Sequence, residues 1–91
     1  MFGGFGLFRG GIMFGIVVDE TLYLKTDDGN RGAFEAAGMA PFRYRRAGKM
    51  VALSYHELPA ELLDGGEDLA AWAEDAFAAA LRGRRKTRPQ R

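Results

Sequence analysis

The first eighteen residues constrain the fold more than any other part of this chain. A glycine-broken apolar run, Phe2 to Phe8, precedes Arg9-Gly10-Gly11, and apolar residues then alternate from Ile12 to Val18. Alternation at every second position indicates a strand, and paired glycines between two such runs indicate a tight turn. We therefore expect a hairpin that begins almost at Met1, where most domains have polar, fraying residues. We also expect that the chain lacks an element which would cover this sheet.

A third strand and a short helix are expected after this hairpin. Thr21 to Thr26 is rich in β-favouring residues and predicts the strand. The helix is expected over Asn30 to Ala37, with Asp27-Asp28 as candidate N-caps and Phe34 as its main anchor. Gly38 is a natural stop for it.

A second hairpin is predicted after Pro41. Phe42 to Arg45 alternates aromatic residues with arginine, which is typical of a strand with one wet face. Met50 to Glu57 predicts its partner strand. The faces of that strand are expected to carry Val51, Leu53 and Tyr55 on one side and Ala52, Ser54 and His56 on the other.

The last part of the chain predicts helix. Pro59 suits the first turn of a short helix through Leu63. A longer helix follows, with acidic residues at its start and Arg82 at its end, as the helix dipole favours. Its apolar stripe consists of Leu69, Trp72, Ala73, Ala76, Phe77, Ala80 and Leu81.

These elements predict an α+β fold with an antiparallel five-stranded sheet, in β-β-β-α-β-β-α order, and helices packed on it. We expect one domain over residues 1–82 and a disordered basic tail over residues 83–91. Both sheet faces should need cover, because the second strand is apolar on each. Its two predicted faces are Met13 and Val17 on one side, and Ile12, Phe14, Ile16 and Val18 on the other.

The net charge of +1 hides a division along the chain. Residues 1–81 hold all twelve acidic residues and seven basic ones, a net charge of −5, whereas the last ten residues hold six basic residues. The chain has no cysteine, which fits a reducing compartment. A mid-stretch Arg9 and six glycines argue against a signal peptide in the first eighteen residues. We expect a cytoplasmic protein.

The order of motifs resembles the N-terminal domain of the TfoX/Sxy family over nearly all of residues 1 to 81. The segments that carry the resemblance are Met1 to Phe8, Thr21 to Asp27 with Asn30-Arg31, Phe34 to Gly38 ahead of Pro41-Phe42, Tyr55 to Pro59, Leu69 to Ala73 and the alanine-rich helix.

This resemblance implies a role in regulating natural competence. The family archetype is a coactivator that works with the cyclic-AMP receptor protein at promoters, so the resemblance implies partners in the transcription machinery. Family members usually have a helix before the Met-Phe-Gly-Gly segment, and the archetype has a second, C-terminal domain. We expect this chain to be a stand-alone copy that lacks both, so that either Met1 is internal in nature or a partner subunit covers the gap. The resemblance supplies no catalytic residue, and we expect a non-enzymatic domain that binds no cofactor or metal and forms a homodimer.

Two motifs could suggest catalysis or phosphate binding. Gly3 to Gly6 is glycine-rich but lacks a P-loop lysine and the setting between strand and helix, so a closely packed strand edge is the preferred interpretation. Ser54, His56 and Glu57 could suggest a hydrolase. Residues two apart on a strand lie roughly 7 Å from each other, beyond hydrogen-bond reach, so a surface strand histidine is preferred.

Two further patterns could suggest metal sites. His56 is the only histidine, so a zinc site would need carboxylates alone to complete it. Asp27 to Asn30 has the composition of a calcium loop but lacks the alternating ligands and the closing glutamate. Helix capping is the preferred role for these aspartates.

Two basic segments remain as candidates for interaction. The predicted second hairpin could bind phosphate or an acidic partner, or could be a solvated edge that resists aggregation. The tail could bind a nucleic acid backbone, and a nucleic-acid-binding module that uses the tail together with the hairpin from Arg43 to Lys49 is the alternative to a protein-interaction domain. The candidate interaction residues are Arg43, Tyr44, Arg45, Arg46, Lys49, Arg84, Arg85, Lys86 and Arg88.

Overall fold

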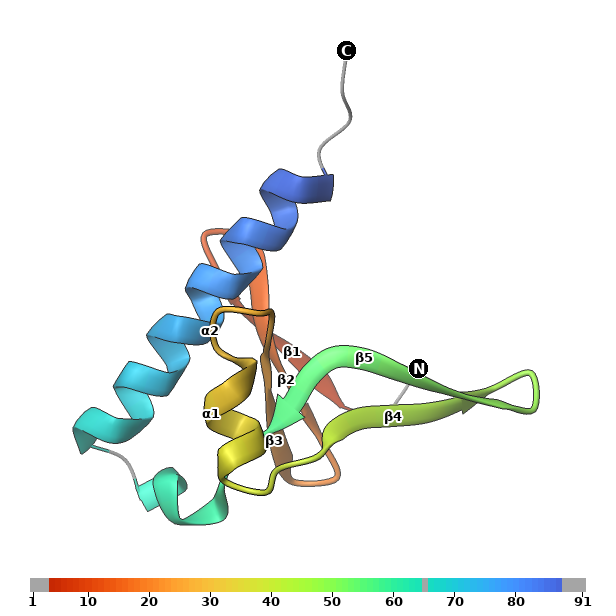
Figure 1. The fold of residues 1–91 in the computed structure, drawn as a ribbon, viewed down its shortest axis with the longest axis horizontal. Helices are drawn as coiled ribbons and strands as arrows, with labels where there is room; N and C mark the ends of the chain where they lie inside the picture. The colour runs from red at the N-terminus through yellow and green to blue at the C-terminus, as the bar shows by residue number, and fades with distance from the viewer. Residues whose placement is uncertain (1–3, 65, 88–91) are drawn as a thin grey trace.

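The computed structural model describes residues 4–64 and 66–87, and side chains for the same residues except 64 and 85–87. It confirms an α+β fold with a five-stranded antiparallel sheet and the expected element order (Figure 1). The elements are β1 (Phe5–Arg9), β2 (Ile12–Val18), β3 (Thr21–Lys25), α1 (Arg31–Ala36), β4 (Pro41–Arg46), β5 (Lys49–Glu57), the 3-10 helix η1 (Ala60–Asp64) and α2 (Gly66–Thr87).

The strand order in the sheet is β1-β2-β3-β5-β4, and every neighbouring pair is antiparallel. β3 therefore lies at the centre, and β1 and β4 form the two edges. The first hairpin turns at Gly10 and Gly11, whose φ angles of 58° and 81° are in the left-handed region that favours glycine. Gly38, with φ of 77°, follows α1 and ends it as expected.

A bulge in β2 changes the faces that the sequence predicts for this strand. Leu7 pairs with Gly15 and Phe8 pairs with Met13, so Phe14 is one extra residue opposite β1. Strict alternation placed Phe14 with Ile16 and Val18, and that prediction is wrong. Phe14 packs on the helix side of the sheet, whereas Ile16 and Val18 lie on the opposite side.

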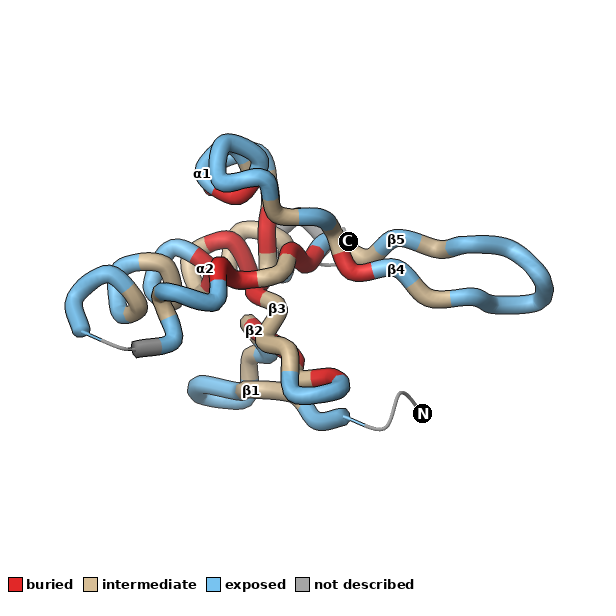
Figure 2. Tube along the Cα trace, turned by 90° about the horizontal axis from the view of Figure 1, so that it is seen from below, coloured by how far each residue is buried: buried red, intermediate tan, exposed pale blue. Residues whose placement is uncertain are grey.

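Both helices cover the same face of the sheet (Figure 2). Leu24 of β3, Phe34 of α1 and Ala76 of α2 are buried together, and the rings of Phe34 and Trp72 meet edge to face with centroids 4.7 Å apart. Phe34 is the anchor of α1, as predicted. Since α1 joins α2 on this face, it gives the other face no cover at all.

The helix-free face is closed in part by aromatic side chains instead. Phe42 of β4 packs edge to face on Tyr23 of β3, with ring centroids 4.9 Å apart. Tyr55 of β5 is 8% exposed, and it belongs to the same cluster as Ile16 and Val18. The twisted sheet thus buries one end of this face and leaves the end over β1 and β2 open.

The end of α2 differs from the prediction. The helix continues past Gly83 to Thr87, so residues 83 to 87 are not the start of a disordered tail. Residues 88–91 of the predicted tail lie outside the described residues. η1 replaces the short helix predicted from Pro59 through Leu63.

Replacing Phe34 by alanine is expected to lower the free energy of unfolding by about 3–5 kcal/mol, because the ring is 1% exposed and its removal leaves a cavity under α2. Urea denaturation followed by circular dichroism measures this change. Met50→Ala is the control, since Met50 is 57% exposed and should change stability by no more than about 0.5 kcal/mol. Equal losses in both variants would contradict the proposed core.

Candidate functional site

The β4–β5 hairpin extends away from the helices and carries a group of exposed cations (Figure 1). Tyr44 lies among them in sequence but faces the core, where it packs against the cluster on the helix-free face. Its ring stacks on that of Phe42 at 6.2 Å between centroids. The wet face predicted for this strand is therefore confirmed, and it presents Arg43 and Arg45 to solvent. Arg46 and Lys49, which pair at the end of the hairpin, are exposed as well.

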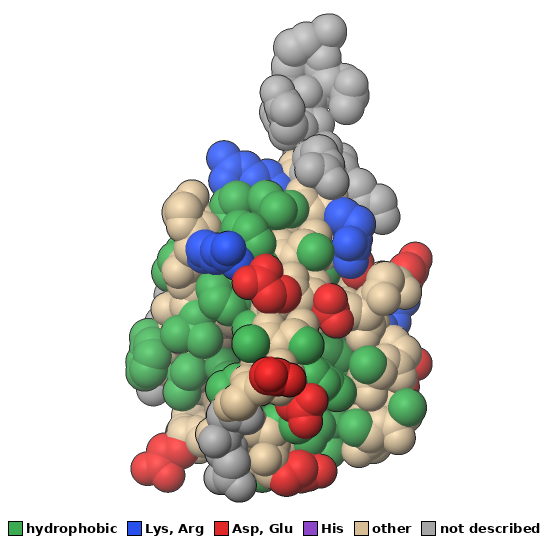
Figure 3. All heavy atoms as spheres, turned by 90° about the vertical axis from the view of Figure 1, so that its left-hand side faces the viewer, with side chains coloured by type: hydrophobic (Ala, Val, Ile, Leu, Met, Phe, Trp, Pro, Cys, Tyr) green, Lys and Arg blue, Asp and Glu red, His purple; other side chains and the backbone are tan. Residues whose placement is uncertain are grey.

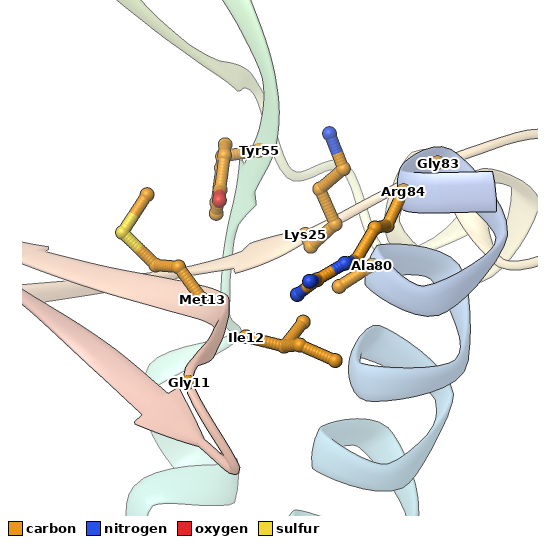
Figure 4. Close-up of a pocket in the computed structure, with 8 residues that line it drawn as sticks. All are labelled: Gly11, Ile12, Met13, Lys25, Tyr55, Ala80, Gly83 and Arg84. Carbon is orange, nitrogen blue, oxygen red and sulfur yellow. The ribbon is translucent and has the colours of Figure 1, made fainter. Parts of the chain in front are cut away.

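A second group of cations lies where α2 leaves the sheet (Figure 4). Lys25 of β3 and Arg84 of α2 line a pocket of about 450 Å³, and its described lining contains no aspartate or glutamate. The Lys25 Nζ lies 5.3 Å from the ring centroid of Tyr55. Figure 4 shows Arg84 reaching from α2 into the pocket. Burial of Tyr55 raises the pKa of its hydroxyl.

Sequence reasoning missed Lys25 as part of a site. The only signal was one basic residue at the end of a β-favouring run, and such residues are common at strand ends. Arg84 was predicted as an interaction residue, and it lines this pocket with Tyr55 of β5. Arg85 and Lys86 belong to α2 by their backbone, and Arg88 lies outside the described residues.

An ion pair connects the end of α2 to the loop before α1. The Arg82 guanidinium donates from Nε to Oδ2 of Asp27 at 2.6 Å and from Nη2 to Oδ1 at 2.7 Å. This hydrogen-bonded guanidinium lowers the pKa of Asp27 to about 2, and the Gly29 N–H, which also donates to the carboxylate, adds to the effect. The two-point geometry fixes both partners in one orientation.

The predicted capping role of Asp27-Asp28 is wrong. Asn30 occupies the N-cap position of α1 without a side-chain capping bond. Its Oδ1 instead accepts from the Asp27 N–H at 2.8 Å, and its Nδ2 donates to the Lys25 carbonyl at 2.9 Å. Asn30 therefore ties the loop to β3. Within residues 4–64 and 66–87, no three His, Cys, Asp or Glu side chains come together as metal ligands.

His56 is buried, which corrects its prediction as a surface residue. It is 6% exposed and lies beside the Phe34 ring, with centroids 5.7 Å apart. Its Nδ1 is 3.0 Å from Oγ1 of Thr26, which is 2% exposed. Burial lowers the pKa of the imidazole. His56 thus acts as a core residue with a satisfied hydrogen bond, and the structure does not turn it toward exposed Ser54.

An apolar groove of about 410 Å³ lies over the first hairpin on the helix-free face. Phe5 and Phe8 at its rim are 64% and 63% exposed. A Cβ atom on Gly4 would lie 1.9 Å from the Val17 carbonyl oxygen, which confirms that this glycine belongs to a closely packed strand edge. The groove is lined by Gly4, Phe5, Gly6, Phe8, Met13, Ile16 and Val18.

The family model for the TfoX N-terminal domain matches residues 1–80. The chain belongs to the TfoX N-terminal domain family. Among curated proteins, none is similar enough to count as a relative of this chain. In the part of the chain that the structure describes, no helix is long and apolar enough to cross a membrane.

The cations of the hairpin and those near the end of α2 differ in whether they lie within the residues that match the TfoX N-terminal domain. The hairpin and the apolar groove lie within the matched residues 1–80, as does Lys25. Arg82 and Arg84 lie beyond the match, on the continuation of α2. The hairpin is therefore part of the domain proper, whereas the cations of the helix end adjoin it.

We expect Asp27→Asn to lower the melting temperature at pH 7, because it removes the negative partner of Arg82. Because the pKa of Asp27 is lower in the native state, its ionised carboxylate stabilises the fold at pH values above the ordinary pKa of 3.8. This contribution is lost as the pH falls toward about 2. In thermal melts from pH 7 to pH 2, the melting temperature of the variant should therefore decrease less than that of the parent. Glu61→Gln, on η1, is the control; parallel curves for the parent and Asp27→Asn would contradict the role of the pair.

Replacing Thr26 by valine is expected to cost about 1–3 kcal/mol, because it leaves the buried His56 Nδ1 without its hydroxyl partner. Thr26→Ser keeps the hydroxyl and is the matched control, which should retain more of the stability. Urea denaturation of both variants at pH 7 measures the difference. If serine destabilised the protein as much as valine, the loss would come from packing rather than from the hydrogen bond.

Proposed function

We propose that this TfoX N-terminal domain is a non-enzymatic protein-interaction domain of the cytoplasm, which acts as a homodimer in transcriptional regulation of the competence type. The observation that carries the proposal is the β4–β5 hairpin. It projects from the body of the domain and presents cations at a surface that the core does not use (Figure 1).

The hairpin has the chemistry to bind an acidic protein surface. Residues 41–50 contain four basic side chains and no acidic one. Arg43 and Arg45 offer planar guanidinium groups that suit carboxylates, and Met50, which pairs with Arg45, adds an exposed apolar contact. Phe42, 6% exposed, anchors the base of the hairpin in the core. A partner could therefore bind the cations without disturbing the fold.

The charge of α2 supports a directed contact at the hairpin. Glu67, Asp68, Glu74 and Asp75 are exposed along the helix, and Figure 3 shows acidic side chains over the middle and lower part of this side of the molecule. An acidic partner is repelled by this surface and attracted to the hairpin. Such complementarity favours one orientation and increases the association rate.

A second candidate function is nucleic-acid binding, and the pocket at the end of α2 favours it. Lys25 and Arg84 gather there, and the chain continues with Arg85 and Lys86. Several cations along one path could contact successive phosphates without base specificity, and such binding falls steeply with salt.

A pull-down from the lysate of the native host, with and without nuclease, separates these functions. We expect the tagged full chain to retain a transcription factor or an RNA polymerase subunit after nuclease treatment, as identified by mass spectrometry. Arg43→Glu/Arg45→Glu should lose this protein, because the cations become carboxylates. A chain that ends at Gly83 should keep it, since the hairpin is intact.

Retention that disappears with nuclease and with the truncation at Gly83 would contradict the protein-interaction proposal and support nucleic-acid binding. If the parent chain retains no protein after nuclease treatment and nothing that depends on nucleic acid, both functions are contradicted. Circular dichroism of the hairpin variant confirms that the charge changes leave the fold intact.

A further inference from the structure

We propose that the β1 edge and the apolar groove beside it bind a second copy of this chain, with the two β1 strands antiparallel about a two-fold axis at Leu7. This inference rests on the proposed function, because it places the homodimer contact on a named surface. It joins two five-stranded sheets into one continuous sheet and leaves the β4–β5 hairpins at the outer ends.

The two edges of the sheet differ in how they admit another strand. β4 carries Pro41, which has no backbone N–H to donate, and exposed Arg43, Arg45 and Arg46, so a second copy would bring like charges together there. β1 has no charge from Phe5 to Phe8 and no proline. An edge strand presents backbone N–H and C=O groups outward, and from Phe5 to Phe8 neither a charge nor a proline blocks pairing.

The exposed side chains at β1 are those expected at an interface. Phe5 and Phe8 are 64% and 63% exposed, and Met13 of β2 is 37% exposed beside them. All three line the groove, whose floor contains the buried Ile16 and Val18. A cluster of large apolar side chains around a groove is unusual on a monomer surface and marks a contact site.

The sequence of β1 is complementary to itself in this register. With the axis at Leu7, residues whose numbers sum to 14 lie opposite each other, so Phe8 of one copy faces Gly6 of the other. The position of a Cβ on Gly6 lies 3.0 Å from Phe8 Cε1 and 2.7 Å from Met13 Sδ within the chain, so large side chains already cover this glycine. Phe8 of the second copy therefore meets an apolar layer of Phe8 and Met13 over this glycine, not a charged side chain.

Charge is compatible with the same register. Arg9, the one charge on β1, falls opposite Phe5 of the second copy and not opposite another Arg9. Within the chain it is held by Glu74 at 3.1 Å and lies 4.6 Å from the Phe77 ring centroid. The pairing therefore brings no like charges face to face.

The buried area fits a specific dimer of moderate size. Four largely exposed phenylalanines and two edge strands bury on the order of 1,000 Å², which is the lower limit for a specific interface. We expect dissociation in the roughly micromolar range, which sedimentation over a wide range of concentration can follow.

Disulfide trapping tests the register directly, because the chain has no cysteine of its own. Leu7→Cys places two thiols opposite each other across the axis, where Cα atoms of paired strands lie about 4.5–5.5 Å apart, within the range of a disulfide. Mild oxidation of the full chain should give a covalent dimer. Arg45→Cys, on the other edge strand, is the matched control and should remain a monomer on a denaturing gel. Failure of Leu7→Cys to cross-link overturns the proposed register.

Sedimentation velocity tests the surface without oxidation. The full chain should be a dimer that Phe8→Lys converts to a monomer, because a cation enters the groove. Met50→Lys makes the same change at an exposed residue far from β1 and should remain a dimer. The inference is overturned if the parent chain stays monomeric. It is also overturned if another protein, or another segment of this protein, occupies the groove.

These outcomes are independent of the hairpin experiment. A monomer that still retains a partner through Arg43 and Arg45 overturns the β1 dimer and leaves the proposed interaction intact. A β1 dimer that retains no partner supports this inference and contradicts the proposed function.

Discussion

The rest of the structure depends on how closely α2 approaches the sheet. Ala76 and Ala79 are fully buried, and a side chain of one carbon lets the helix backbone come near β2 and β3. Leu24 and Phe34 then fill the remaining space, each 1% exposed. Because dispersion contacts are lost quickly as a gap opens, a larger residue in place of either alanine would move the helix away from both. The position of α1 follows from this contact, since Phe34 holds it against Trp72.

Because both helices lie on one face of the sheet, the other face has no helix to cover its apolar side chains. The sheet must bury its second face with its own side chains, and Tyr23, Phe42 and Tyr55 do so where β3, β5 and β4 twist together. Large aromatic rings suit this task because each buries much apolar area and Tyr keeps its hydroxyl near water. Phe8 of β1, at the other end of this face, remains 63% exposed. The open groove is therefore a consequence of the same packing that protects the core.

Much of the fold could be predicted from the sequence, because the decisive signals are local. The glycine pair, the β-favouring strands and the stripe of α2 each lie within one segment, and Gly38 ends α1 as expected. The exposed face of the hairpin also follows from alternation. The bulge at Phe14 could not be predicted, since only the pairing with β1 shows the extra residue. His56 and Asp27 were misassigned for the same reason: Thr26 is 30 residues from His56, and Arg82 is 55 residues from Asp27.

The two edges of the sheet can serve different contacts without competition. β1 and β4 are separated by three strands, which at a strand spacing of about 4.8 Å sets the edges about 19 Å apart. A second copy at β1 would therefore leave Arg43 and Arg45 of each hairpin accessible. Two hairpins on one dimer would also face an acidic partner together, and the second contact would then form within one complex. A weak interaction at each hairpin could in this way become a strong one, provided that the partner presents two acidic surfaces at the matching distance.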